Sequence, residues 1–238
     1  MTEPAFWAIV PAAGVGRRMS SAIPKQYLPL SGRLVIDHAL ERMLLHPSID
    51  GLYLALSEED QWWDDTEFAG HPGLVRVPGG RERCHSVLNA LERLRQRAGP
   101  DDWVLVHDAA RPCVRRSDID HLIRMVRSHD VGGLLGMPVN DTMKRTDGAD
   151  RVIETVERSH LWRAFTPQMF RFGALFSAIR DALDAGFLVT DEASAVERAG
   201  MRPIMVESHP DNLKITRPED LALAAYYLER QEAELTRS

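Results

Sequence analysis

Short apolar runs alternate with amphipathic segments along the chain. The runs are rich in Val, Leu and Ile, which is typical of strands buried in a parallel sheet, and they cover 6–10, 51–56, 74–77, 103–107 and 133–139. Between them apolar side chains recur at helical spacing, at Ile36, Leu40, Met43 and Leu44, at Val87, Ala90, Leu91 and Leu94, and at Ile119, Leu122, Ile123 and Val126. This alternation predicts an α/β, Rossmann-like fold with a mostly parallel sheet and helices on both faces.

The loops after three of these strands contain Pro11, the pair Gly79-Gly80, and Asp108. Ligands of parallel sheets bind beyond the carboxyl ends of the strands. We therefore expect these loops to converge on one edge of the sheet.

The pattern weakens between about 140 and 160, where charged residues are frequent. Thr-Asp-Gly at 146–148 is a turn signal between two candidate strands, 142–145 and 152–156, so a projecting β-hairpin is predicted. An isolated hairpin is marginally stable in water. We therefore expect this arm to pack against a second subunit.

Regular patterns return after the arm. Helices are predicted at 172–184 and 191–198, a strand at 202–206, and a last helix that opens with a capping box from Thr216 to Glu219. No repeat, low-complexity tract or linker divides the chain. The prediction is one domain over 1–238, with the arm inserted at about 140–160.

Composition limits the class of protein. The chain has 238 residues, 44% of them hydrophobic, and a net charge of −6, which argues against nucleic acid as the main partner. Cys84 and Cys113 lack the spacing of a zinc site and are expected to be unpaired thiols of a reducing compartment. An acid near the N-terminus and the lack of a long apolar segment predict a cytoplasmic protein with no membrane span.

A local positive charge follows the first strand. Asp and Glu are missing from 4 to 36, whereas Arg17, Arg18 and Lys25 lie there beside small residues and glycines. Closely approaching backbone N–H groups and cationic side chains suit a polyphosphate; a solvated basic loop is the alternative. This stretch is not a P-loop, because Gly16 is not followed by the Lys-Ser/Thr pair of that motif. It is not a dinucleotide-binding fingerprint either, because Met19 stands where that motif has a third small residue.

Several blocks occur in a specific order: PAAGVGRRM at 11–19, PKQYLPL at 24–30, VHDAARP at 106–112, DTMKR at 141–145, TPQ at 166–168, TDEASAVE at 190–197 and NLKITRPEDL at 212–221. Together they resemble the 2-C-methyl-D-erythritol 4-phosphate cytidylyltransferases of the non-mevalonate isoprenoid pathway. The resemblance implies transfer of CMP from CTP to methylerythritol phosphate with release of pyrophosphate, by a homodimer whose arms complete each other's site.

The attacking phosphate monoester has a second pKa of about 6, so it needs no general base at neutral pH, and His107 is expected to be a structural residue at a strand end. The difficulty is charge repulsion, which preorganised cations relieve. The resemblance assigns this role to Arg18, Lys25 and Lys214. It assigns the triphosphate to Pro11, Ala12, Ala13, Gly14, Gly16 and Arg17. Taken alone, Lys214 is better explained as a solvated lysine at a strand end.

The remaining assignments also come from the resemblance. Cytosine is assigned to Gly79, Gly80 and Ser86, although Arg81 departs from the acid or small residue common there. The ribose and Mg²⁺ are assigned to the region of Asp108 and Ala109, with Asp108 as the metal ligand. The acceptor is assigned to Asp108, Arg111, Thr142, Arg158, Thr166, Thr190 and Asp191, with Thr142 and Arg158 supplied by the neighbouring subunit. The simpler alternatives are an Asp108–Arg111 ion pair and a helix N-cap at Thr190.

Two other functions are compatible with parts of this pattern. A cytidylyltransferase for another polyol phosphate, such as ribitol 5-phosphate, would share the nucleotide blocks and differ in the arm and at 166–192. A non-catalytic nucleotide-binding subunit would be expected to lose Arg18, Lys25 or Lys214, and all three are present.

Overall fold

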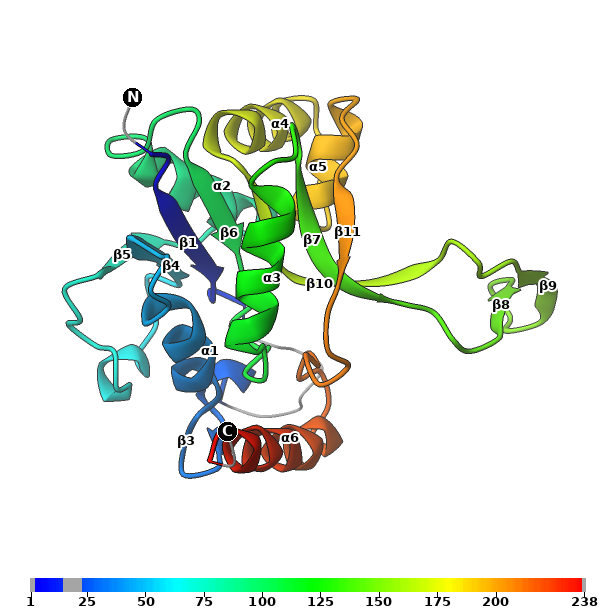
Figure 1. Ribbon diagram of the computed structural model, residues 1–238, viewed down its shortest axis with the longest axis horizontal. Helices are drawn as coiled ribbons and strands as arrows, with labels where there is room; N and C mark the ends of the chain where they lie inside the picture. The colour runs from blue at the N-terminus through cyan, green and yellow to red at the C-terminus, as the bar shows by residue number, and fades with distance from the viewer. Residues whose placement is uncertain (1–2, 15–22, 237–238) are drawn as a thin grey trace.

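The computed structural model describes residues 3–14 and 23–236. Within these ranges a seven-stranded sheet has the strand order β11-β7-β10-β6-β1-β4-β5 (Figure 1). Its strands are β1 (Phe6–Pro11), β4 (Gly51–Leu56), β5 (Leu74–Pro78), β6 (Trp103–Val106), β7 (Gly132–Pro138), β10 (Trp162–Arg171) and β11 (Ile204–Glu207). The predicted strands are confirmed within one or two residues at each end.

The strand β10 was not predicted from the sequence. It lies between β6 and β7 and is antiparallel to both, whereas the other neighbouring pairs are parallel. Pro167 interrupts its apolar run, and a proline inside such a run argues against a central strand. The structure accommodates it where the pairing with β7 shifts register, between Ala164 and Gln168.

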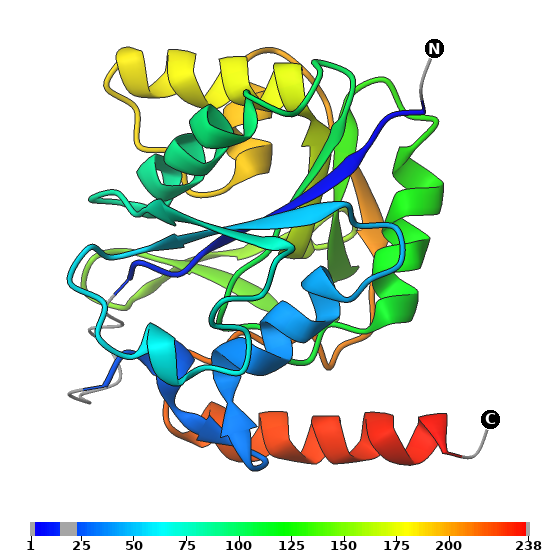
Figure 2. The same cartoon turned by 90° about the vertical axis from the view of Figure 1, so that its left-hand side faces the viewer.

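Helices cover both faces of the sheet (Figure 2). Side chains of α1 (Val35–Leu44) and α3 (Arg116–Val126) join the core on one face. Those of α2 (Arg83–Leu94), α4 (Phe172–Asp184) and α5 (Glu192–Arg198) join the core on the other. Burial of these apolar stripes is the main stabilising term. The predicted fold class is confirmed.

The last helix, α6 (Glu219–Leu235), packs over a smaller cluster with β2 (Pro29–Leu30) and the start of α1. The predicted capping box was wrong. The carboxylate of Asp220 accepts hydrogen bonds from the backbone N–H groups of Thr216 and Arg217 and from the Thr216 hydroxyl, so Thr216 lies outside the helix. Short elements at β3 (Arg33–Leu34), η2 (Lys25–Tyr27) and η3 (Trp63–Asp65) were not predicted.

The predicted hairpin is present as β8 (Met143–Thr146) and β9 (Val152–Val156). It projects from the body of the protein on the two strands β7 and β10 (Figure 1). Its outer side chains are open to solvent: Val152 is 61% and Ile153 62% exposed. The arm therefore presents apolar surface that nothing else in the described chain covers.

The two thiols, Cys84 and Cys113, are buried and free. Among the described helices, none combines the length and apolar character needed to cross a membrane.

Candidate active site

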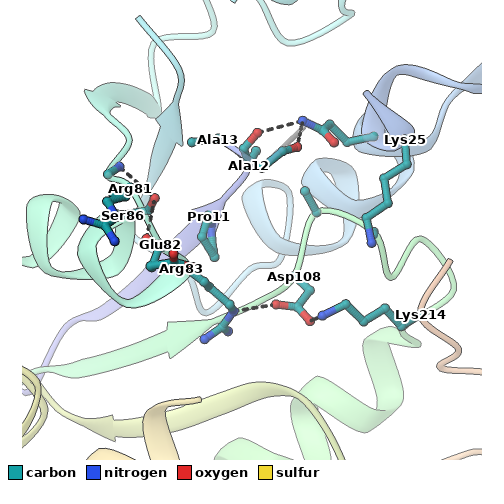
Figure 3. Close-up of a pocket in the computed structure, with 15 residues that line it drawn as sticks. Pro11, Ala12, Ala13, Lys25, Arg81, Glu82, Arg83, Ser86, Asp108 and Lys214 are labelled. Atoms are coloured by element: carbon teal, nitrogen blue, oxygen red, sulfur yellow. Dashed lines mark hydrogen bonds and ion pairs between the residues drawn. The ribbon is translucent and has the colours of Figure 1, made fainter. Parts of the chain in front are cut away.

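A pocket of about 460 Å³ lies beyond the carboxyl ends of β1, β5 and β6 (Figure 3). The three loops expected to converge do meet there. Pocket volumes of this size are common for nucleotide-sized ligands. The described residues that line it are Pro11, Ala12, Ala13, Gly14, Lys25, Gln26, Gly80, Arg81, Glu82, Arg83, Ser86, Asp108, Ala109, Ala110 and Lys214.

The loop after β1 is held by a side chain that sequence reasoning did not select. The Gln26 amide donates to the backbone oxygen of Ala12 at 2.7 Å and to that of Gly14 at 3.3 Å. Next to it, the Lys25 ammonium donates to the backbone oxygen of Ile215 at 2.9 Å. The candidate residues Gly16, Arg17 and Arg18 lie outside the described residues.

The glycine pair forms a close approach between two loops. A Cβ atom at Gly79 would lie 2.2 Å from the Cβ of Ala13, and one at Gly80 would lie 2.3 Å from the Cβ of His85. The Gly80 N–H donates to the Ser86 hydroxyl at 3.0 Å. Only glycine therefore fits both positions without displacing a neighbour. Arg81, which stands where an acid or a small residue is common, is exposed and lines the pocket.

Asp108 is the centre of the charged part of the pocket and is 7% exposed. Its Oδ1 accepts from the Nε of Arg83 at 2.9 Å, and its Oδ2 lies 2.8 Å from the Lys214 ammonium. The alternative of an Asp108–Arg111 ion pair is only a minor part of this arrangement, because that contact is 3.7 Å long. Arg111 instead donates to the backbone oxygen of Asn212 at 2.7 Å.

These contacts determine the charge of Asp108. Burial alone would raise the pKa of the carboxyl group. The nearby charges of Arg83, Lys214 and Arg111 outweigh burial and hold the pKa of Asp108 well below its ordinary range. The group is thus a carboxylate at neutral pH.

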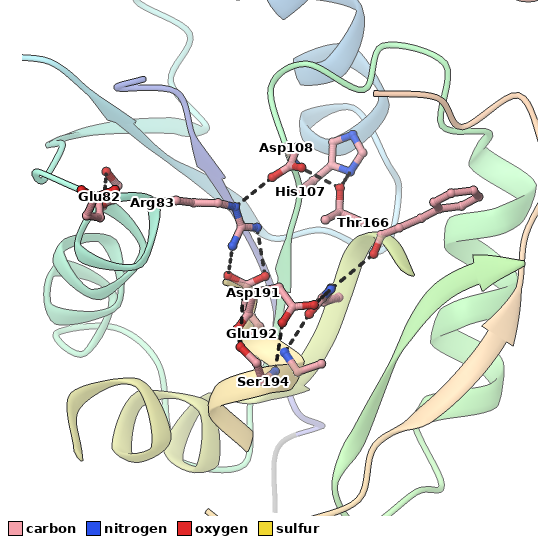
Figure 4. A network of polar contacts seen from close by, with 12 residues as sticks. Glu82, Arg83, His107, Asp108, Thr166, Asp191, Glu192 and Ser194 are labelled. Atoms are coloured by element: carbon pink, nitrogen blue, oxygen red, sulfur yellow. Dashed lines mark hydrogen bonds and ion pairs between the residues drawn. The ribbon is translucent and has the colours of Figure 1, made fainter. Parts of the chain in front are cut away.

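Arg83 also reaches the first residue of α5 (Figure 4). Its Nη1 and Nη2 atoms donate to the two carboxylate oxygens of Glu192, at 2.7 and 3.0 Å. Burial lowers the pKa of Arg83, but the charges of Glu192 and Asp108 raise it by a larger amount. The net shift of the pKa is therefore upward. Sequence reasoning missed both residues. Glu192 lies in the block TDEASAVE at 190–197, directly after Asp191, whereas Arg83 lies outside the blocks, three positions after Gly80.

His107 supports the floor of the pocket from below. It is fully buried; its Nε2 contacts the backbone oxygen of Arg111 at 3.0 Å and its Nδ1 the Thr166 hydroxyl at 3.0 Å. The same hydroxyl accepts the N–H of Asp108. Burial lowers the pKa of His107 to about 4. The imidazole is therefore a neutral structural group, as expected.

A family model for 2-C-methyl-D-erythritol 4-phosphate cytidylyltransferase matches residues 6–230. The chain belongs to this family. The cytidylyltransferase of Hahella chejuensis is 53% identical over 97% of this chain and 95% of that protein, and the one from Pseudomonas fluorescens (strain Pf0-1) is 54% identical over 92% and 93%. The crystal structure of the Francisella tularensis 2-C-methyl-D-erythritol 4-phosphate cytidylyltransferase has a TM-score of 0.83 at 36% identity, covering 94% of this chain and 99% of that one.

A crystal structure of 4-diphosphocytidyl-2C-methyl-D-erythritol synthase has a TM-score of 0.82 at 34% identity and covers 96% of this chain and 100% of that one. The match of model and fold over nearly the whole length makes the chain a nucleotidyltransferase of the cytidylyltransferase family.

The structure brings only some of the cytidylyltransferase acceptor candidates together. Thr166 lies against Asp108, as described above. Asp191 is the N-cap of α5: its Oδ1 accepts the N–H of Ser194 at 3.0 Å and its Oδ2 accepts from the Gln168 amide at 2.9 Å. The alternative that Thr190 caps this helix was therefore wrong; Thr190 is exposed just before the cap.

Thr142 and Arg158 are not in the pocket. They lie on the arm, where they line a separate shallow hollow of about 280 Å³ with Thr155, Val156 and Glu157. The Arg158 guanidinium donates to the backbone oxygen of Asn140. Within one chain the arm thus keeps these two candidates apart from the other acceptor residues (Figure 1).

Proposed function

We propose that the pocket transfers the cytidylyl group of CTP to the phosphate of 2-C-methyl-D-erythritol 4-phosphate, giving 4-diphosphocytidyl-2-C-methyl-D-erythritol and pyrophosphate. The observation that carries this proposal is one pocket that combines a glycine turn, a carboxylate that is ionised at neutral pH and the ammonium groups of Lys25 and Lys214. The turn suits a planar base, and the cations suit phosphates in transfer.

The chemistry follows from charge. The acceptor phosphate is largely dianionic at neutral pH and needs no proton removed before it attacks the α-phosphorus. Lys25 and Lys214 lie on the same side of the pocket, across from the turn that carries Arg81 and Ser86 (Figure 3). Positive charge at these points would oppose the repulsion between the two phosphates and stabilise the charge that builds up as pyrophosphate leaves. Arg17 and Arg18, which lie outside the described residues, would add to this charge.

Mg²⁺ is part of the same proposal. Within the described residues, no group of three or more Asp, Glu, His or Cys side chains could hold a metal ion. Two carboxylates line the pocket, Asp108 and Glu82, and we assign the ion to Asp108. So few protein donors fit an ion that is held mainly by phosphate oxygens and water. Bound there, the ion would neutralise phosphate charge.

We further propose that the chain acts as one domain and works as a cytoplasmic homodimer. Thr142 and Arg158 are separated from the pocket in one chain, and the arm exposes Val152 and Ile153. Pairing of arms would cover this surface and bring the two polar side chains to a neighbouring pocket. The two free, buried thiols fit a reducing compartment.

The test is pyrophosphate release by the purified protein with CTP and Mg²⁺, with methylerythritol 4-phosphate or ribitol 5-phosphate as acceptor. Release with the first acceptor alone is expected. Release with ribitol 5-phosphate alone would contradict the acceptor assignment, and silence with both would favour the non-catalytic alternative. Sedimentation of the protein at micromolar concentration tests the dimer.

A further inference from the structure

We propose that Arg83 is a positioning residue for this transfer: it fixes the Asp108 carboxylate to the acceptor side of the pocket through Glu192. The inference rests on the proposed function and adds to it a residue whose guanidinium is bound to two carboxylates of the site. Three hydrogen bonds carry it, one to Asp108 and two to Glu192.

The guanidinium fork makes Arg83 a rigid spacer. Its Nε faces Asp108 while its two Nη atoms face Glu192, so a rotation of the group would break contacts on both sides (Figure 4). Glu192 is 1% exposed and cannot follow such a rotation. A lysine would keep the charge but could not hold both carboxylates in this geometry.

The anchor itself is fixed to the backbone. Glu192 is the first residue of α5, and the preceding Asp191 caps that helix and binds Gln168 of β10. On the other side, Arg83 is the first residue of α2, directly after the turn where Gly80 donates to Ser86. Arg83 therefore connects the glycine turn, Asp108 and the acceptor segment at 190–192.

The same contact decides how strongly Asp108 holds Lys214. The carboxylate divides its two oxygens between an anchored arginine and a lysine whose side chain is 39% exposed. Without the arginine, the carboxylate would be free to turn both oxygens toward Lys214. The ammonium group would then be less available to a phosphate, and turnover would fall while the nucleotide half of the pocket stayed in place.

A structural ion pair of the same kind offers a matched control. Arg33 also bridges two carboxylates, Glu41 and Glu67, and its side chain is 24% exposed, against 25% for Arg83. It does not line the pocket. The carboxylates that Arg33 bridges are more exposed, at 32% and 51%, than Asp108 and Glu192, at 10% and 1%. The control therefore tests whether exchanging a bridging arginine for lysine changes kcat by itself.

The first experiment compares Arg83→Lys with Arg33→Lys in steady-state kinetics, CTP binding by calorimetry and thermal unfolding. We expect Arg83→Lys to lower kcat by about 10- to 100-fold, as outer-sphere positioning groups do, with the calorimetric CTP affinity within about twofold of wild type. Arg33→Lys should leave kcat unchanged. A wild-type kcat in Arg83→Lys would overturn the inference.

The second experiment asks whether Arg83 acts through Asp108. In an Asp108→Asn background, Arg83→Lys should lower kcat by less than about twofold, since coupled residues are not additive. A full second loss in that background would contradict the assigned route. Should Arg83→Lys unfold, the double variant Arg83→Met/Glu192→Gln removes both charges together, and the same loss of kcat is expected from it.

The failure of the inference is distinguishable from failure of the proposed function. Wild-type protein that releases no pyrophosphate from CTP and methylerythritol 4-phosphate would remove both. Active wild-type protein with active Arg83 variants would remove only the role of Arg83.

Discussion

The pocket and the arm of this protein are built in opposite ways. Around the pocket, side chains from distant parts of the chain contact one another at short distances and are largely buried. Three ion pairs connect Glu192 to Arg83, Arg83 to Asp108, and Asp108 to Lys214. Along the arm, β8 is exposed throughout and its ion pair Arg145–Glu154 joins two side chains that are 62% and 54% exposed. Such surface pairs add about 0–1 kcal/mol.

The difference applies to the residues assigned to the two substrates. The described residues assigned to the nucleotide are held by contacts within one chain, so they need little reordering on binding. Two of the residues assigned to the acceptor, Thr142 and Arg158, lie on a segment that leaves the body of the protein. A complete acceptor site then requires that the arm be placed by something outside its own chain.

The largest effect is expected inside the pocket. Lys25→Ala should lower turnover by about 10² to 10³, the size expected for loss of one preorganised charge contact. Thermal unfolding should be nearly unchanged, because the Lys25 side chain is only half-buried. Lys144→Ala, which removes a lysine bonded to Thr155 on the arm, is the control and should retain activity. Normal turnover in a folded Lys25→Ala protein would contradict the assigned role.

The arm should act on the neighbouring pocket. Arg158→Ala is expected to lower turnover by about 10- to 100-fold, the value of a charged hydrogen bond to a phosphate. A heterodimer of one Arg158→Ala chain and one Lys25→Ala chain contains one intact site, so about half of the wild-type activity should return. Separately tagged chains purified by both tags provide the measurement. A heterodimer without activity would show that each arm serves its own chain or none.

Low pH should lower the free energy of unfolding through His107, which lies below the pocket next to Asp108. The arm should not contribute to this loss. Because burial lowers the pKa of His107 to about 4, against about 6.5 in an unfolded chain, its stabilising contribution is complete above about pH 6.5. It is lost as the pH falls toward 4, by about 2 kcal/mol at pH 5. The pKa values of buried His38 and His46 are also lowered.

Urea unfolding at pH 7.5 and pH 5 measures this loss, and an NMR titration assigns it. His160→Gln removes an exposed histidine of the arm and should leave the difference between the two pH values unchanged. A His107 imidazole that is protonated at pH 6 would contradict the prediction.

The smallest effect is expected on CTP affinity, in a comparison of alanine substitutions at two glycines. Gly80→Ala introduces a Cβ only 2.3 Å from that of His85, so the turn must shift, and CTP affinity should fall about tenfold. Gly148→Ala, at the arm's turn, meets nothing within 4 Å and should change neither affinity nor stability measurably. Calorimetry with CTP alone tests both. Equal affinities in the two variants would mean that the glycine turn does not contact the nucleotide.

Local patterns in the sequence were sufficient for most of the elements and for the meeting of the three loops. Period and residue type specify a helix or a strand over a few residues, and the parallel arrangement of strands then places their following loops at one edge. The positions of Gly79 and Gly80 could be recognised because a missing Cβ is a local property. The arm was recognised from its turn.

Only the tertiary structure decided how distant residues combine. The place of β10 in the centre of the sheet depends on its pairing with β6 and β7. The local pattern did not predict this strand, because Pro167 interrupts its apolar run. Arg83, Glu192 and Lys214 become partners of one another or of Asp108 because strand order brings α2, α5 and the segment after β11 to the same edge. Charges attract over distances in space, and the order of residues along the chain does not contain those distances.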